Sequence, residues 1–168
     1  APPVHALRKQ LEALGLPPPE ERGELVLMQA SGYVRAEIGR ALLLADVGDV
    51  GPDYLPGHAH ADTLSFELSL CGRRILVNSG TSVYEASERR LWERGTSAHN
   101  TVVVDNANSS EVWSSFRVAR RARAFDVQAV RLGNRLIVEG AHNGYRHVSG
   151  RVIHRRRWTL TGQDLLIE

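Results

Sequence analysis

The fold class is first visible in one alternating segment, Thr63-Leu64-Ser65-Phe66-Glu67-Leu68-Ser69-Leu70. Apolar and polar residues alternate along it, which is typical of a strand with one buried side and one solvent-facing side. A turn at Cys71-Gly72 follows, and a second apolar strand is expected over Arg74–Asn78. The two strands and their short turn predict an antiparallel hairpin.

Strand-like runs of this kind continue along most of the chain. Those before residue 63 are separated by Ser31-Gly32 and by Gly39, which are turn residues. The expected strands are Glu24–Ala30, Tyr33–Ile38, Arg40–Ala45, Thr63–Leu70, Arg74–Asn78, Thr101–Asp105, Phe116–Val130, Arg135–Glu139, Val152–Leu160 and Asp164–Ile167. About ten strands joined by short turns predict an all-β fold, a layered antiparallel β-sandwich.

Two short helices interrupt this pattern. Val4–Leu14 has its apolar residues on one helical face, and a stiff spacer, Pro17-Pro18-Pro19, follows it. Ser87–Arg94 begins with a serine that can cap a helix. We therefore divide the chain into residues 1–23 and residues 24–168, the sandwich.

Composition limits the kind of protein this is. The chain has 168 residues and is 42% hydrophobic, which suits one domain with a substantial core. It contains no apolar run near the roughly 20 residues of a membrane span, so no membrane partner is expected. Ala1 is not a natural start, and the strand-like run ending at Glu168 has no turn after it. These features predict a piece of a longer protein.

The charged residues are unevenly distributed. Residues 1–112 carry 10 Lys or Arg and 15 Asp or Glu, whereas residues 113–160 carry 11 Arg and two acidic residues. The planar fork of Arg suits carboxylate, sulfate or phosphate groups, which favours an anionic ligand. Solvent-facing charge on strands explains the arginines equally well. No nucleic-acid partner is expected, because the basic stretch lacks interleaved aromatic residues and any DNA-binding motif.

Cys71 is the only cysteine, which excludes an internal disulfide and Cys-based zinc motifs. Its strand context predicts a buried, unreactive thiol.

Candidate chemistry lies in a histidine-rich turn, Gly57-His58-Ala59-His60-Ala61-Asp62. In an extended segment, His58 and His60 point to the same face and can line one cavity. His99 is expected at the start of another strand. Imidazole serves as a general acid or base and as a metal ligand, although a histidine in a turn is more often a surface or hydrogen-bonding residue.

The order of several segments resembles the β-domain of the heparinase II/III-like polysaccharide lyases. The resemblance covers about Glu24 to Glu168. It rests on the segments Gly57–Leu68, Gly72–Thr81, Ala98–Asp105, Gly140–Arg146 and Val152–Arg157.

The resemblance implies a helical toroid before the sandwich, with the sugar bound in the cleft between them. Residues 1–23 would then be a linker or the remnant of that preceding helical domain. The implied reaction is β-elimination next to a uronic acid, and the implied location is periplasmic or secreted. His58 matches the catalytic histidine. The tyrosine acid/base belongs to the toroid, so the chain alone is expected to be inactive. His142, Tyr145 and Arg146 are candidate substrate-binding residues, although His142 and Tyr145 could equally pack a turn.

The resemblance also implies a structural metal at His60, Asn78 and His99, zinc or another divalent ion. An Asp is common at the position of Asn78, and a neutral amide predicts weak binding. Asp62 could take its place, or could instead orient a histidine.

The leading hypothesis is therefore the β-domain of a lyase that acts on an acidic polysaccharide, with heparan sulfate, alginate and other uronates all open. The alternative is a non-catalytic carbohydrate-binding or structural β-sandwich.

Overall fold

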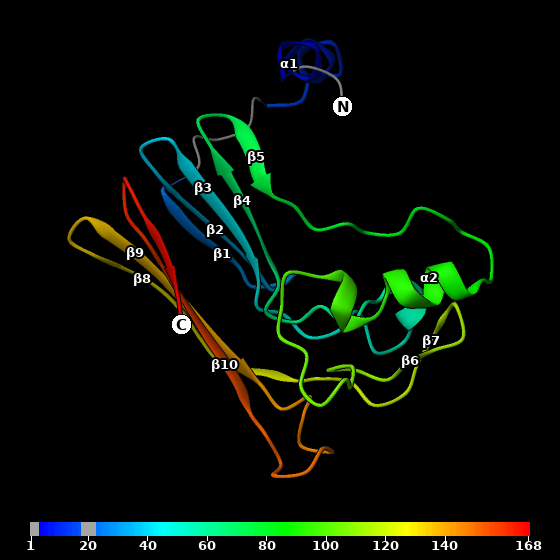
Figure 1. Ribbon diagram of the computed structural model, residues 1–168. Helices are drawn as coiled ribbons and strands as arrows, with labels where there is room; N and C mark the ends of the chain where they lie inside the picture. Colours follow the sequence, from blue (N-terminus) through cyan, green and yellow to red (C-terminus); the bar gives the residue numbers. More distant parts are fainter. Residues whose placement is uncertain (1–3, 18–22) are drawn as a thin grey trace.

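The computed structural model describes residues 4–17 and 23–168, and most of its regular structure is antiparallel sheet (Figure 1). The all-β, layered fold expected from the sequence is confirmed. A short helix, α1 (Val4–Ala13), precedes the sheets as expected. Pro18 and Pro19 of the expected spacer lie outside the described residues, and the division at residue 23 stays a prediction.

The first sheet has five strands in simple up-and-down order, each hydrogen-bonded to the next along the chain. In order across the sheet they are β1 (Leu25–Met28), β2 (Tyr33–Ile38), β3 (Ala41–Asp46), β4 (Phe66–Leu70) and β5 (Arg73–Leu76). Alternate residues of β3 are buried, as a strand with one core-facing side requires.

The second sheet has four strands in the order β11-β10-β9-β8, and a separate hairpin is formed by two very short strands. The bounds are β8 (Ala124–Leu132), β9 (Arg135–His142), β10 (His154–Leu160), β11 (Leu165–Ile167), β6 (Val112–Trp113) and β7 (Arg117–Val118). The remaining elements are the helix α2 (Glu88–Glu93) and two 3₁₀ turns, η1 (Pro56–His58) and η2 (Thr96–Ala98). Figure 1 shows α2, η1 and the small hairpin together beyond one end of the two large sheets.

The two large sheets bury one apolar core between them. Its members come from both sheets and the segments next to them: Val34, Ala36, Ala41, Leu43, Ala45, Val47, Leu64, Phe66, Leu68, Leu136, Val138, Trp158 and Leu160. Arg156 of β10 is buried against it, with its guanidinium 5.7 Å from the ring centroids of both Phe66 and Trp158. It donates to the carbonyls of Leu64 and Asn100, at 2.8 and 2.7 Å, and so links the second sheet to the loop that carries the candidate site.

Three expectations about the strands are wrong. Thr101–Asp105 forms only an isolated bridge at Val104, because Asp105 and the next residue have positive φ values of 50° and 55° and turn the chain back. His99 therefore does not open a strand. The run expected over Phe116–Val130 is broken between β7 and β8. The strand expected from Thr63 starts only at Phe66, since Leu64 has a φ of 65°.

Cys71 is exposed, not buried as its strand context predicts. It occupies the β4–β5 turn with a φ of 51°, next to Gly72 with a φ of 75°. A tight turn of this kind points its residues to solvent.

Among the described residues, no helix combines the length and the apolar composition needed to cross a membrane.

Candidate functional site

The histidine-rich turn lines a cavity of about 360 Å³ at the α2 end of the first sheet. His58, His60 and Asp62 contribute to its wall from the turn, Asp46 from the end of β3, and Asn78 from the segment after β5. A larger groove of about 630 Å³ lies beside this cavity, but no histidine lines it. The smaller cavity is therefore the candidate site.

The turn has a different shape from the one expected. Pro56–His58 is a 3₁₀ turn, and the chain becomes extended only at Ala59. His58 and His60 nevertheless line the same cavity. The His58 ring lies 5.7 Å from the ring of Tyr84, which is 69% exposed. Tyr84 was not identified from the sequence, because a single tyrosine in an irregular loop gives no pattern.

His60, Asp62 and His99 bring one ligand atom each to within 4.8 Å of the others. His60 Nδ1 and His99 Nε2 are 3.3 Å apart. Two nitrogens bound to one tetrahedral zinc at about 2.0–2.1 Å are about 3.4 Å apart, so this spacing fits a shared metal ion. The donor set of two imidazoles and a carboxylate also suits zinc.

Asn78 lies next to His99, and its role as a metal ligand stays a prediction. Its Oδ1 accepts a hydrogen bond of 2.6 Å from His99 Nδ1. Because Nδ1 carries the proton of His99, Nε2 keeps an electron pair that faces His60 Nδ1 and can accept a hydrogen bond from it or bind a metal ion. Asn78 thus orients a candidate ligand, and Asp62 provides the carboxylate beside the two imidazoles.

Burial controls the protonation of this cluster. It lowers the pKa of His60 to about 4, against a smaller opposing effect of Asp62, and it lowers the pKa of His99 to about 4. Both imidazoles are therefore neutral at pH 7, which is the form that binds metals. Burial raises the pKa of Asp62, and burial together with Asp62 raises the pKa of Asp46 to about 8. A cation here would offset this crowding of carboxyl groups.

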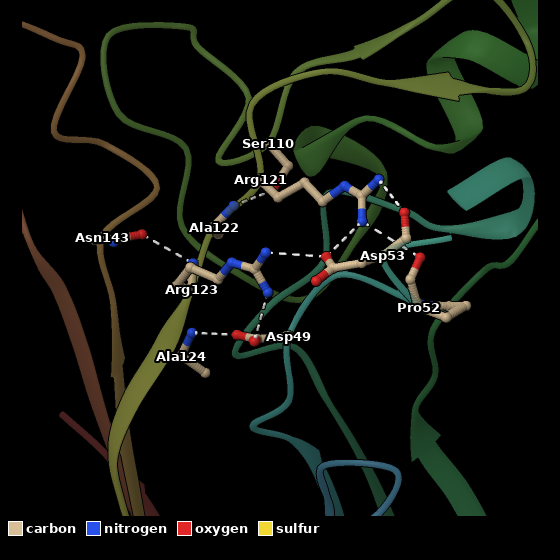
Figure 2. Close-up of polar contacts among 9 residues, drawn as sticks. All are labelled: Asp49, Pro52, Asp53, Ser110, Arg121, Ala122, Arg123, Ala124 and Asn143. Carbon is tan, nitrogen blue, oxygen red and sulfur yellow. Dashed lines mark hydrogen bonds and ion pairs between the residues drawn. The ribbon is translucent and has the colours of Figure 1, made fainter. Parts of the chain in front are cut away.

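The loop between β3 and the turn is fixed to the second sheet by charged side chains (Figure 2). Arg123 pairs with Asp49 and Asp53, each at 3.0 Å, and Arg121 also donates to Asp53 at 2.9 Å. Asp49 accepts a further bond from the backbone N–H of Ala124, where β8 begins. Because Asp49 lines the cavity, this network fixes one of its walls.

The candidate substrate-binding residues lie apart from the cavity. His142 and Tyr145 are fully buried, and the Tyr145 hydroxyl donates to the carbonyl of Val102. These are the positions of residues that pack a turn. Arg146 is exposed. A direct role in substrate binding stays a prediction for all three.

Comparison with known proteins identifies the family. The model of the heparinase II/III-like C-terminal domain matches residues 20–168. The chain belongs to this heparinase II/III-like family. This chain is similar to the heparin-sulfate lyase of Bacteroides stercoris. The two are 38% identical over 61 residues, which are 34% of this chain and 9% of that protein.

Solved structures agree on the fold of this heparinase II/III-like domain. The heparan sulfate lyase HepC from Pedobacter heparinus superposes with a TM-score of 0.66 and 20% identity, covering 95% of this chain and 24% of that one. A heparinase III gives a TM-score of 0.65 and 18% identity, over 89% and 22% of the two chains. The chain thus spans about a quarter of these structures, and at this identity the likeness describes the fold alone.

Proposed function

We propose that this chain is the β-domain of a polysaccharide lyase that cleaves uronic-acid-containing acidic polysaccharides by β-elimination. Membership of the heparinase II/III-like family supports the reaction class. The observation that carries the proposal is the position of His58, at the wall of a cavity and beside an exposed aromatic ring. In this proposal, a helical domain of the same protein completes the cleft and supplies the second acid/base group.

β-Elimination needs a base for the C5 proton, a group that stabilises the charge growing on the uronate, and an acid for the leaving oxygen. The His58 imidazole moves one of these protons. Tyr84 offers the flat side of its ring next to His58, where a sugar ring can stack. One acid/base group contributes about 10²- to 10⁴-fold, so the domain without its helical partner has no measurable turnover.

His60, Asp62 and His99 hold a divalent metal, with zinc as the best match to their nitrogens and spacing. The metal acts as a structural link between the turn and the segment around His99. Asn78 keeps the His99 ring in the orientation that presents Nε2.

The test is turnover of heparan sulfate, alginate and other uronate polymers, followed as the new ultraviolet absorbance of an unsaturated product. The longer protein should be active, the 168-residue chain should not, and His58→Ala in the longer protein should lose about 10²- to 10⁴-fold. His5→Ala, at an exposed position on α1, is the matched control.

Normal turnover by His58→Ala would refute the catalytic role of this histidine. Binding of a uronate polymer without any turnover by the longer protein would favour the alternative, a non-catalytic carbohydrate-binding domain.

A further inference from the structure

Two arginines one helical turn apart are almost completely buried: Arg90 within α2, and Arg94, the residue that caps its C-terminus. Among the described residues, neither forms an ion pair; their side chains bond mainly to main-chain carbonyls. Burying a guanidinium without a carboxylate is costly, and buried charges are poor evidence of a role in stability. We therefore ask which main-chain segments Arg90 and Arg94 hold in place.

Arg90 connects the turn of His58 to the segment of Tyr84. Its Nη2 donates to the carbonyl of Gly57 at 3.4 Å, directly before His58. Its Nη1 donates to the carbonyl of Val83 at 3.0 Å, directly before Tyr84. Its Nε donates to a third carbonyl, that of Ser115, at 2.9 Å. One planar group thus fixes the chain on both sides of the His58–Tyr84 contact.

Ring stacking adds to these bonds. The Arg90 guanidinium lies 4.4 Å from the ring centroid of Phe116 and 5.3 Å from that of Tyr84. The Tyr84 and Phe116 rings are themselves 5.4 Å apart. Tyr84, although largely exposed, is therefore held from behind by Arg90 and Phe116.

Arg94 contacts the other half of the same turn. Its Nε donates to the carbonyl of Ala59 at 2.9 Å, and its own carbonyl accepts from the N–H of Ala61, also at 2.9 Å. His60 lies between these two contacts. Arg94 Nη2 has no hydrogen-bond partner among the described residues, although it is buried. A buried donor without a partner costs about 1–3 kcal/mol of stability.

We infer that Arg90 and Arg94 divide the positioning of the two histidines. Arg90 sets His58 against Tyr84 on the substrate side, and Arg94 sets His60 toward His99 on the metal side. They are positioning residues, not catalytic ones. The chemical role of each histidine rests on the proposed function. The effect of each arginine on the position of a histidine ring does not.

Lysine is the informative replacement, because it keeps the charge and removes the geometry. Its ammonium is a point donor on a flexible stem, and it cannot bond to several separated carbonyls while stacking on two rings. Arg89→Lys is the matched control: Arg89 is on the same helix but exposed, where it pairs with Glu93.

The experiment records the imidazole NMR signals of all seven histidines in the 168-residue chain at a fixed pH, well below the melting temperature of each variant. Arg90→Lys should shift the signals of His58 and leave those of His60 and His99. Arg94→Lys should shift the signals of His60 and His99 and leave those of His58. Arg89→Lys should move none of them, and the distant His154 reports any general rearrangement.

Two functional readouts separate this inference from the proposed function. In a zinc titration, Arg94→Lys should weaken binding about 10-fold or more, and Arg90→Lys should leave it unchanged. In the longer protein, Arg90→Lys should lower kcat with little change in KM. If the wild type binds no zinc or turns over no polymer, the proposed function fails, while the NMR signals still decide the positioning.

Equal shifts of both histidines in both lysine variants would overturn the division, and so would unchanged signals in either. If Arg90→Lys does not fold, Phe116→Leu takes its place, because it removes the stacking partner and keeps the hydrogen bonds. It should shift His58 alone. If Arg94→Lys does not fold, Arg94→Gln keeps a donor near Ala59 and should shift His60 and His99 and leave His58.

Discussion

Two histidine pairs in this domain have nearly the same spacing and different surroundings. His60 and His99 approach to 3.3 Å with ring centroids 5.1 Å apart, and His142 and His154 approach to 3.0 Å with centroids 4.9 Å apart. Burial is the main cause of a lowered pKa in both pairs, to about 4 for His60, His99 and His154 and to about 3 for His142.

The neighbours of each pair decide what it can bind. The backbone N–H of Gly144 donates to His142 Nδ1, so His142 Nε2 carries the proton and donates to His154 Nδ1. His142 Nε2 and His154 Nδ1 are therefore both engaged in one hydrogen bond between the two rings. At His99, Asn78 accepts the Nδ1 proton, so Nε2 keeps an electron pair that faces His60 Nδ1 and can accept a hydrogen bond from it or bind a metal ion. The donor beside His142 places a proton between the rings of that pair, the structural pair. The acceptor beside His99 leaves Nε2 able to bind a metal ion, so His60 and His99 are the proposed ligand pair.

The largest effect expected from this contrast is on zinc binding. His60→Ala and His99→Ala should reduce zinc affinity below the detection limit of calorimetry, because each removes a nitrogen from a three-residue site. His154→Ala should leave the affinity unchanged, provided that the variant is shown to be folded. Equal loss from both pairs would remove the distinction between them.

The free energy of unfolding should depend more on the structural pair than on the proposed ligand pair. His142 is fully buried, and His142→Ala leaves a cavity and strands the donor of Gly144 and the acceptor of His154. We expect it to lower the free energy of unfolding by about 2–4 kcal/mol. His60→Ala, measured with a chelator present, should cost about 1 kcal/mol, because the His60 ring is only partly buried. Urea unfolding of both variants tests this order, which a larger loss at His60 would reverse.

Acid should destabilise the structural pair. The unfolded chain binds protons at these histidines near pH 6.5, well before the folded chain does at about 4 or about 3. Their contribution to stability is therefore complete above pH 6.5 and is lost as the pH falls below it. The loss is at most about 1.4 kcal/mol per pH unit for each histidine.

The variant for this test is His154→Gln, which keeps hydrogen-bonding groups and cannot titrate, with His5→Gln at an exposed position as the control. Unfolding free energies from pH 7 to pH 4.5, with a chelator present, should fall less steeply in His154→Gln. An unchanged slope would mean that the pair does not titrate as described.

The strands and turns of this fold were largely predictable, because alternation and turn residues are local signals. The expected hairpin at Cys71-Gly72 formed where the turn residues indicate. The segment Thr101–Asp105 looked like a strand by composition, but it is held by side-chain contacts such as that of the Tyr145 hydroxyl to the Val102 carbonyl, which no local pattern encodes.

The sequence pointed to the histidines of the candidate site, but not to the residues that hold those histidines in place. His58 and His60 were found by their spacing, and they line one cavity. Arg90 and Arg94 act on carbonyls that lie more than 30 residues away along the chain, so only the folded chain reveals them. Likewise, only the folded chain shows that Asp62 lies beside His60 and His99 and that Asn78 bonds to His99 Nδ1.

The smallest effect concerns Asn78, which accepts the His99 Nδ1 proton in the first pair. Asn78→Asp would place a carboxylate on His99 Nδ1 in place of an amide oxygen. A carboxylate is a stronger acceptor and raises the basicity of the opposite nitrogen, so zinc affinity should rise by about 10-fold. Asn78→Ala should lower it by a similar factor, because the ring loses its orientation. Calorimetry on both variants would show whether Asn78 orients His99: affinities equal to that of the wild type in both would mean that it does not, and that Asp62 and the two imidazoles set the affinity alone.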